Sequence, residues 1–252
     1  MLTAILRDVY EHGFAVIPDF LDTREVDDLR QECDSLVEAA EGHEWSAGED
    51  QHQWIVRRGC IFPTIHPVNE PFLPTSLEAF AAMRTIWPCT LKACQILLST
   101  KMLNLVVSLL GKGACLFNDQ YIVKSPHCGA ASAFPWHCDD AWLPSEDRED
   151  KAYLSVWIAL DDMTEESGTL VVQPMRRMCD TSHNQHPSAM PPEVITVPAG
   201  TVVVMASSLA HCSLPNKGSR MRRAYMPQFS ADPMCDKSGV PLALAVPVCT
   251  QT

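Results

Sequence analysis

The sequence predicts a mainly β protein with flanking helices, whose core is a sandwich or a jelly roll. After residue 113, short β-prone runs alternate with segments rich in Pro, Gly, Asp and Ser, which is typical of a sandwich or jelly roll. The intervening segments are too short to supply the helix that a parallel sheet needs between successive strands. A length of 252 residues with 46% hydrophobic composition fits one domain. We therefore expect a single domain over residues 1–252, with N-terminal helices over 1–112 and a jelly-roll core over 113–232.

The N-terminal part is expected to contain helices and one strand. Residues 2–11 show a helical pattern, and the run 14–17 is β-prone and ends at a proline. A second helix follows, capped by Asp22 or Thr23. Its apolar residues recur at steps of three and four and predict a buried face: Val26, Leu29, Cys33, Leu36 and Val37.

The middle of the chain is less regular. Residues 41–76 are rich in Gly, His, Pro and Asn and predict a long irregular segment. Two further helices fit residues 77–110, and the clearer one, 97–110, ends at Gly111 as a helix C-terminus should. The expected strands then follow at 115–124, 134–139, 152–160, 168–174, 193–197, 201–206 and 221–230.

Composition and charge exclude several kinds of partner. The chain has 31 acidic and 19 basic residues and a formal net charge of −12, which repels nucleic acids and anionic membrane surfaces. No apolar run approaches the roughly 18 residues that cross a bilayer, and the first residues lack the apolar core of a secretory signal. The 11 cysteines form no CxxC pair, which favours reduced thiols over disulfides or zinc. We expect a cytoplasmic protein with a small-molecule substrate; the sequence does not indicate its oligomeric state.

Three residues are candidates for binding a metal ion. His137 and Asp139 are two residues apart, so on a strand both side chains project from the same face. Such a pair is common and is usually a solvated surface pair, but His211, after an apolar run, offers a third ligand that a jelly roll can bring close. Two histidines and one carboxylate leave three coordination positions open. This suits Fe(II) that binds a chelating co-substrate and dioxygen, whereas zinc prefers a closed or four-coordinate site.

Arg222 is a candidate for binding a carboxylate. It lies on the strand expected after His211, where an inward-pointing guanidinium can hold a carboxylate through two hydrogen bonds. Arg223 would then point outward. The alternative is that both arginines are ordinary surface charges.

As a set, these motifs resemble the phytanoyl-CoA dioxygenase (PhyH-like) family of Fe(II)/2-oxoglutarate oxygenases. The site motifs are His137-x-Asp139, His211-x-Ser213-x-x-Asn216 and Arg222-Arg-Ala. The resemblance covers most of the chain. It includes Gly13-Phe14-x-Val-Ile-Pro-Asp-Phe-Leu, Val156-Trp157-Ile-Ala-Leu-Asp-Asp with its Glu-Ser-Gly168-Thr-Leu turn, and Pro198-Ala-Gly200-Thr.

The resemblance implies a core that is a double-stranded β-helix of the jelly-roll, cupin-like kind. It also implies a catalytic iron on His137, Asp139 and His211, with 2-oxoglutarate and dioxygen as co-substrates. It places the distal carboxylate of 2-oxoglutarate on Arg222 and on the hydroxyl of Ser213.

The same resemblance suggests roles for further residues. Trp157 and Gln120 match positions that line the co-substrate pocket. Tyr121 and Lys124 lie on a similar strand, where alternation lets only one of each neighbouring pair face inward. Trp136, Trp142 and His127 flank the metal motif and are candidates for substrate contacts; core packing for the tryptophans and a solvated imidazole for His127 are the alternatives.

One departure and one retained residue bear on the reaction. Family members commonly continue the strand around residue 173 with Gly-Ser-His, whereas this chain has Met175-Arg176-Arg177. The substrate therefore need not be the acyl-CoA that names the family. Asp139 is retained where halogenating relatives have a small residue, so the resemblance favours hydroxylation of an unactivated C–H bond with release of succinate and CO2. The alternatives are a cupin-like metal enzyme that does not use 2-oxoglutarate, and a jelly-roll binding protein without activity.

Overall fold

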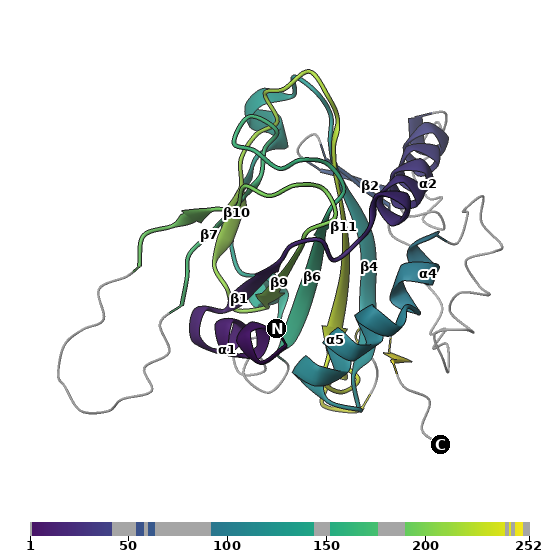
Figure 1. Cartoon of the computed structure of the whole chain (residues 1–252), viewed down its shortest axis with the longest axis vertical. Helices are drawn as coiled ribbons and strands as arrows, with labels where there is room; N and C mark the ends of the chain where they lie inside the picture. Colours follow the sequence, from purple (N-terminus) through teal and green to yellow (C-terminus); the bar gives the residue numbers. More distant parts are fainter. Residues whose placement is uncertain are drawn as a thin grey trace.

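Figure 1 shows the computed structural model, which describes residues 2–41, 54–57, 60–63, 92–143, 152–175, 190–239, 242 and 245–248. Two antiparallel sheets face each other, and the described α-helices pack on the larger sheet. These helices are α1 (Leu2–His12), α2 (Thr23–Glu41), α4 (Lys92–Leu97) and α5 (Thr100–Leu110). Among the described helices, none is long and apolar enough to cross a membrane.

The larger sheet has the strand order β1-β9-β6-β11-β4-β3-β2, with β12 pairing with β4. The bounds are β1 (Phe14–Ile17), β9 (Val202–Ala206), β6 (Tyr153–Ala159), β11 (Arg222–Ser230), β4 (Cys115–Lys124), β3 (Cys60–Pro63), β2 (Trp54–Arg57) and β12 (Val246–Pro247). The smaller sheet has the order β5-β10-β7-β8, with β5 (Phe134–His137), β10 (His211–Ser213), β7 (Leu170–Val172) and β8 (Glu193–Val194). This confirms the predicted mainly β jelly roll with flanking helices. The two sheets do not close into a barrel.

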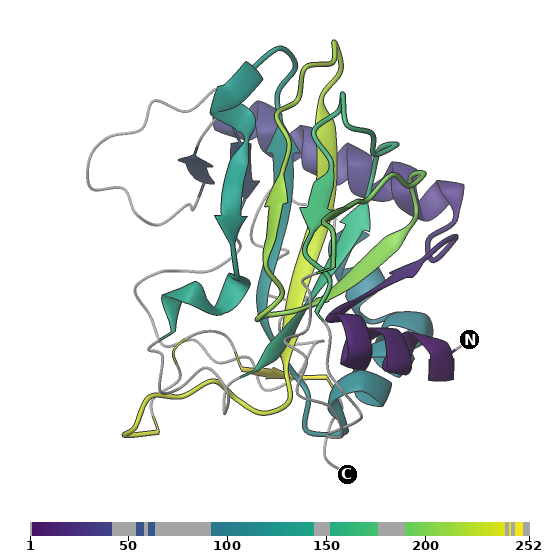
Figure 2. The same cartoon turned by 90° about the vertical axis from the view of Figure 1, so that its left-hand side faces the viewer.

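The two faces of the larger sheet bury different sets of side chains. Strand β6 is buried at every position. Its Val156 and Ile158 pack with the helices in one core, whereas Trp157 and Ala159 pack in a second core between the sheets. Figure 2 shows α2 crossing the far side of the larger sheet, away from the smaller one. Helices therefore cover the outer face, and the inner face is left for the space between the sheets.

Carboxylates cap helix α2 and join it to α4. At its start, Asp22 Oδ1 accepts from the Glu25 N–H and Glu25 accepts from the Asp22 N–H, both at 2.9 Å. This reciprocal cap selects Asp22 of the two predicted residues and stabilises a helix by about 1 kcal/mol. Further along, the fully buried Glu32 accepts from the Lys92 N–H at 2.6 Å, and thereby caps α4.

The middle of the chain differs from the prediction at two places. The single helix expected over 97–110 is divided, because Ser99 has an extended backbone and its side chain accepts from the Met102 N–H, which starts α5. The irregular interpretation of 41–76 is wrong for β2 and β3, which pair as a hairpin. The other residues of 42–76, and the part of the predicted helical region over 77–91, lie outside the described residues.

The chain changes sheet just before His211. The sequence predicts a strand over 201–206 followed by small residues that lead to this histidine, and β9 does stop at Ala206, in the larger sheet. A turn closed by the Leu209 N–H donating to the Ala206 carbonyl at 2.9 Å then leads to β10 in the smaller sheet. A strand of three residues has too little sequence pattern to be recognised alone. It is this short strand that carries His211 and Ser213.

Candidate metal centre and anion pocket

A cavity of about 120 Å³ lies between the two sheets. It is lined by residues that the sequence singles out and by apolar side chains of both sheets. The lining residues are Gln120, Ile122, Phe134, His137, Asp139, Trp157, Leu170, Met205, His211, Ser213, Arg222 and Met226. The predicted metal ligands and the predicted co-substrate residues thus line the same cavity.

The structure brings His137, Asp139 and His211 together. One ligand atom from each lies within 4.8 Å of the other two. Asp139 Oδ1 lies 3.7 Å from His137 Nε2 and 3.6 Å from His211 Nε2. His137 and His211 are also directly opposed across the β5–β10 pair, with ring centroids 4.3 Å apart. Residues remote in sequence therefore form one cluster of two imidazoles and one carboxylate.

Local backbone structure explains how the two members of the His-x-Asp motif share a side. The predicted strand over 134–139 ends at His137, and Asp139 instead begins the short 3-10 helix η2 (Asp139–Trp142). The intervening Cys138 keeps an extended backbone, with φ −108° and ψ 143°. The alternation of a strand therefore continues across Cys138 and leaves both side chains on one side.

Both imidazoles are oriented by backbone carbonyls. His137 Nδ1–H donates to the Pro135 carbonyl at 2.8 Å, and His211 Nδ1–H donates to the Leu209 carbonyl at 3.0 Å. These bonds leave the lone pair of each Nε2 facing Asp139, as a metal ligand requires. Burial lowers the pKa of His211, and the opposing effect of the Asp139 charge does not restore it. The ring is therefore held neutral, which is the form that binds metals.

Another part of the cavity wall is basic. Arg222 is 1% exposed, and its Nη2 donates to the Gly168 carbonyl at 3.1 Å. Its guanidinium carbon lies 6.0 Å from the centroid of the Trp157 ring. Lys124, fully buried on the neighbouring strand and paired in register with Arg222, donates from Nζ to Ser213 Oγ at 2.6 Å. Arg222 and the Ser213 hydroxyl line the cavity here, and Lys124 donates to that hydroxyl, which suits a carboxylate.

A glycine allows this wall to close. The carbonyl that accepts from Arg222 belongs to Gly168, whose φ is +84°. A Cβ at this position would lie 2.6 Å from the Leu214 carbonyl oxygen. Only glycine fits this close approach, so the turn that contacts Arg222 depends on this residue.

The structure resolves the alternation on β4 that the sequence leaves open. Gln120 and Lys124 face the interior, whereas the Tyr121 hydroxyl donates to Glu32 Oε1 at 3.0 Å on the helix side. Strand alternation also separates Arg222 from Arg223, which points to α2. Lys124, whose orientation the sequence leaves open, is thus a second basic residue on the inner face.

The three candidate substrate residues do not line the cavity. Trp136 and Trp142 are 49% and 50% exposed, and His127 is exposed with a φ of 57°. Trp142 Nε1 donates to the Tyr153 hydroxyl at 3.1 Å. Met175 contacts the N-terminal region, where its N–H donates to the His12 carbonyl at 2.8 Å; Arg176 and Arg177 lie outside the described residues.

Sequence reasoning also missed polar residues that contact Asp139. Ser155 Oγ donates to Asp139 Oδ2 at 2.5 Å, and Gln228 Nε2 donates to Ser155 Oγ at 2.8 Å. Period-two counting along β6 from Trp157 and along β11 from Arg222 would have placed both side chains on the inner face. No motif marks either residue.

A jelly roll that presents two histidines and one carboxylate to an internal cavity has the site typical of non-haem iron oxygenases. A profile of the phytanoyl-CoA dioxygenase (PhyH) family matches residues 9–224. The chain belongs to this family, as the sequence motifs predict. No curated protein sequence matches it significantly.

Several solved structures share the fold. The non-heme alpha ketoglutarate dependent carbocyclase SnoK from nogalamycin biosynthesis is 22% identical, with a TM-score of 0.59 over 90% of this chain and 83% of SnoK. The epimerase SnoN, in complex with Fe3+, alpha ketoglutarate and nogalamycin RO, is 15% identical, with a TM-score of 0.61 over 98% and 94%. EvdO2 from Micromonospora carbonacea var. aurantiaca, complexed with 2-oxoglutarate, is 22% identical, with a TM-score of 0.57 over 97% and 93%. At these identities the likeness concerns the fold.

Proposed function

We propose that the chain is a non-haem Fe(II)- and 2-oxoglutarate-dependent dioxygenase that hydroxylates a small organic substrate at an unactivated C–H bond. His137, Asp139 and His211 would hold the iron. The observation that carries the proposal is that one cavity contains both a cluster of two imidazoles and a carboxylate and a basic wall at Arg222.

The residues fit both groups. For the metal, the two histidine Nε2 atoms and Asp139 Oδ1 converge, while the Nδ1 atom of each histidine and Asp139 Oδ2 make hydrogen bonds to other groups. Three protein ligands leave positions for a chelating acid and dioxygen. For 2-oxoglutarate, Arg222 and Ser213 would bind the distal carboxylate, with Lys124 donating to the same hydroxyl. Trp157 and Gln120 would form the sides of this pocket.

Bound iron and 2-oxoglutarate would supply the activation of dioxygen, with loss of CO2 from the co-substrate and release of succinate. The chain's own residues orient the bound groups and exclude water. Arg222 and Ser213 fix one end of the acid, and the imidazoles are held by backbone carbonyls. Apolar side chains such as Ile122, Leu170 and Met226 keep water from the reacting atoms, which directs the oxidant to the substrate.

Hydroxylation is supported by the retention of Asp139. The solved structures of the same fold include a carbocyclase, an epimerase and a monooxygenase, so one oxidant serves several reactions in this fold. We also propose that residues 1–252 form one domain and that the protein is cytoplasmic. The seven free cysteines among the described residues support the cytoplasmic location, because the cytosol keeps thiols reduced.

The test is anaerobic addition of Fe(II) and then 2-oxoglutarate to the metal-free chain. The expected result is a weak visible absorption band from the chelated co-substrate, followed by succinate release when oxygen is admitted. Asp139→Ala should bind little metal and show neither signal, because it removes the one charged ligand. Asp161→Ala, which removes a carboxylate on the helix side of the sheet, serves as the matched control and should retain both signals.

Other outcomes would contradict the proposal. Iron binding without the band, and turnover that does not depend on 2-oxoglutarate, would indicate a cupin-like metal enzyme of another kind. Absence of iron binding in the parent chain would indicate a binding protein.

A further inference from the structure

A row of three polar side chains crosses the inner face of the larger sheet and ends at Asp139. Gln228 on β11 is paired in register with Asn118 on β4 and, on its other side, with Ser155 on β6. Residues paired in this way lie in a line across the strands. Ser155 and Gln228 are 0% and 6% exposed, so the row is built into the sheet and is not a surface feature.

The hydrogen bonds of this row all point in one direction. Asn118 Nδ2 donates to Gln228 Oε1 at 2.6 Å, which turns the amide nitrogen of Gln228 toward Ser155. Gln228 Nε2 then donates to Ser155 Oγ at 2.8 Å, and Ser155 Oγ donates to Asp139 Oδ2 at 2.5 Å. Gln228 Nε2 also lies 3.4 Å from the same carboxylate oxygen. An ionised carboxylate only accepts hydrogen bonds, so it is the natural end of such a chain.

Asp139 is consequently divided into two different oxygens. Oδ2 is engaged by Ser155, whereas Oδ1 faces His137 Nε2 and His211 Nε2 at 3.7 and 3.6 Å. We propose that Asn118, Gln228 and Ser155 are positioning residues that make Asp139 a one-oxygen metal ligand. This inference rests on the proposed function.

The consequence concerns the number of open coordination positions. A carboxylate that bound with both oxygens would occupy two positions and leave one fewer for the co-substrate and dioxygen. Residues that orient a metal ligand typically change metal affinity about 10–100-fold when they are removed. The two histidines are oriented by backbone carbonyls, so among the three proposed ligands only Asp139 is oriented by side chains that substitution can remove.

The experiment measures metal binding by the metal-free full chain. Mn(II) titration followed by the electron paramagnetic resonance signal of the free ion gives Kd, and the visible spectrum of the Co(II) form reports coordination number. The variants are Ser155→Ala, Gln228→Leu and Asn118→Ala. Ser230→Ala is the matched control, because Ser230 is a buried serine on β11 whose hydroxyl donates to the Asp232 carbonyl at 2.7 Å, outside the row.

We expect a graded result that follows the order of the row. Ser155→Ala should weaken Mn(II) binding by about 10–100-fold, Gln228→Leu by less, and Asn118→Ala by the least. The Co(II) spectrum of Ser155→Ala should change toward a higher coordination number, and Ser155→Thr, which keeps the hydroxyl, should restore the affinity. Ser230→Ala should match the parent.

A purely structural role would give a different pattern. It would lower the thermal stability of the metal-free variants while Mn(II) affinity and the Co(II) spectrum stayed as in the parent, and this result would overturn the inference. If Ser155→Ala does not fold, Gln228→Leu and Asn118→Ala decide by the same criteria. A parent chain that binds neither metal would overturn the proposed function and the inference together, whereas a parent that binds and variants that equal it would overturn the inference alone.

Discussion

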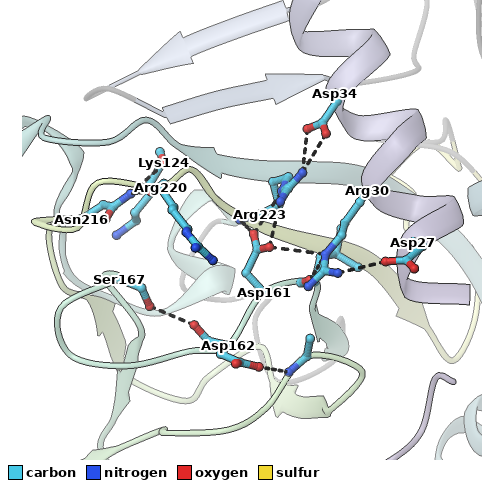
Figure 3. A network of polar contacts seen from close by, with 12 residues as sticks. Asp27, Arg30, Asp34, Lys124, Asp161, Asp162, Ser167, Asn216, Arg220 and Arg223 are labelled. Atoms are coloured by element: carbon cyan, nitrogen blue, oxygen red, sulfur yellow. Dashed lines mark hydrogen bonds and ion pairs between the residues drawn. The ribbon is translucent and has the colours of Figure 1, made fainter. Parts of the chain in front are cut away.

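Arg222 and Arg223 are neighbours on β11, yet they belong to opposite faces of the larger sheet. Arg222 lies in the cavity wall with Trp157 and Gly168. Arg223 points to α2 and donates to Asp34 of that helix at 2.8 Å and to Asp161, which follows β6, at 2.9 Å (Figure 3). Burial lowers the pKa of Arg223, but the hydrogen bonds and charges of Asp161 and Asp34 outweigh this effect and raise it.

The difference shows that strand alternation, and not residue type, assigns the role of each arginine. The outer guanidinium is matched by carboxylates of the chain itself and fastens a helix to the sheet, as does Arg30 of α2 through its ion pair with Asp161 (Figure 3). The inner guanidinium borders a cavity large enough for an organic acid. The outer face of the sheet thus carries ion pairs to a helix, and the inner face borders the cavity that we propose binds 2-oxoglutarate.

The largest expected effect separates the two arginines by their influence on co-substrate binding. Arg222→Met should raise the apparent Km for 2-oxoglutarate about 100-fold, because it removes a charge-assisted carboxylate contact of about 2–3 kcal/mol. Arg223→Met should leave that Km close to the parent value. The measurement is succinate release against 2-oxoglutarate concentration. Equal Km values for both variants would contradict the assignment of the inner face.

The next effect concerns stability and reverses the order of the two positions. Arg223→Met should lower the free energy of unfolding by about 1–3 kcal/mol, since it removes the cation paired with Asp34 and one of the two arginines paired with the partly buried Asp161. The value is below that of a fully buried pair because Asp34 remains 46% exposed. Urea unfolding of the metal-free protein measures it.

The matched control is the exposed pair of Arg7 and Asp8, in which the arginine is 62% exposed. Arg7→Met should change the free energy of unfolding by less than about 0.5 kcal/mol. A loss as large as that of Arg223→Met would mean that the contacts to α2 contribute nothing specific.

The smallest effect is a dependence of stability on pH that arises on the inner face. Because burial depresses the pKa of His211 in the folded chain, the unfolded chain binds a proton more readily below its usual pKa of about 6.5. Stability of the metal-free chain should therefore fall as pH decreases through this range, by up to about 1.4 kcal/mol per pH unit. His211→Gln should flatten this part of the profile, while Arg223→Met should retain it. Parallel profiles for the parent and His211→Gln would refute this origin.

The fold and the site were predictable to different degrees. The jelly roll follows from the spacing of β-prone runs, and the residues of the metal cluster and Arg222 follow from motifs with recognisable spacing. What the sequence could not supply is the orientation of residues outside motifs. Lys124 and Tyr121 lie on one strand, and only the position of α2, with Glu32 facing Tyr121, decides which side each occupies.

The sequence also does not predict the register between neighbouring strands. Asn118, Gln228 and Ser155 align only because β11 pairs with β4 and β6 at fixed offsets, with an irregularity between Gln228 and Phe229. A shift of one residue would turn Gln228 to the other face. Short strands such as β10 are also hard to predict, since three residues are too few to show the alternation of side chains that is typical of a strand.

The pairing of β1 with β9 has a consequence for solubility. Strand β9 contains Val202–Ala206, and its four residues 202–205 are fully buried. On one side it pairs with β6, and on the other side only β1 separates it from the end of the sheet. Loss of residues 2–17 would expose the backbone of a very apolar strand to other molecules, which is a template for intermolecular strand addition. The N-terminal segment, which contributes no residue to the proposed metal site, thus protects the protein from self-association.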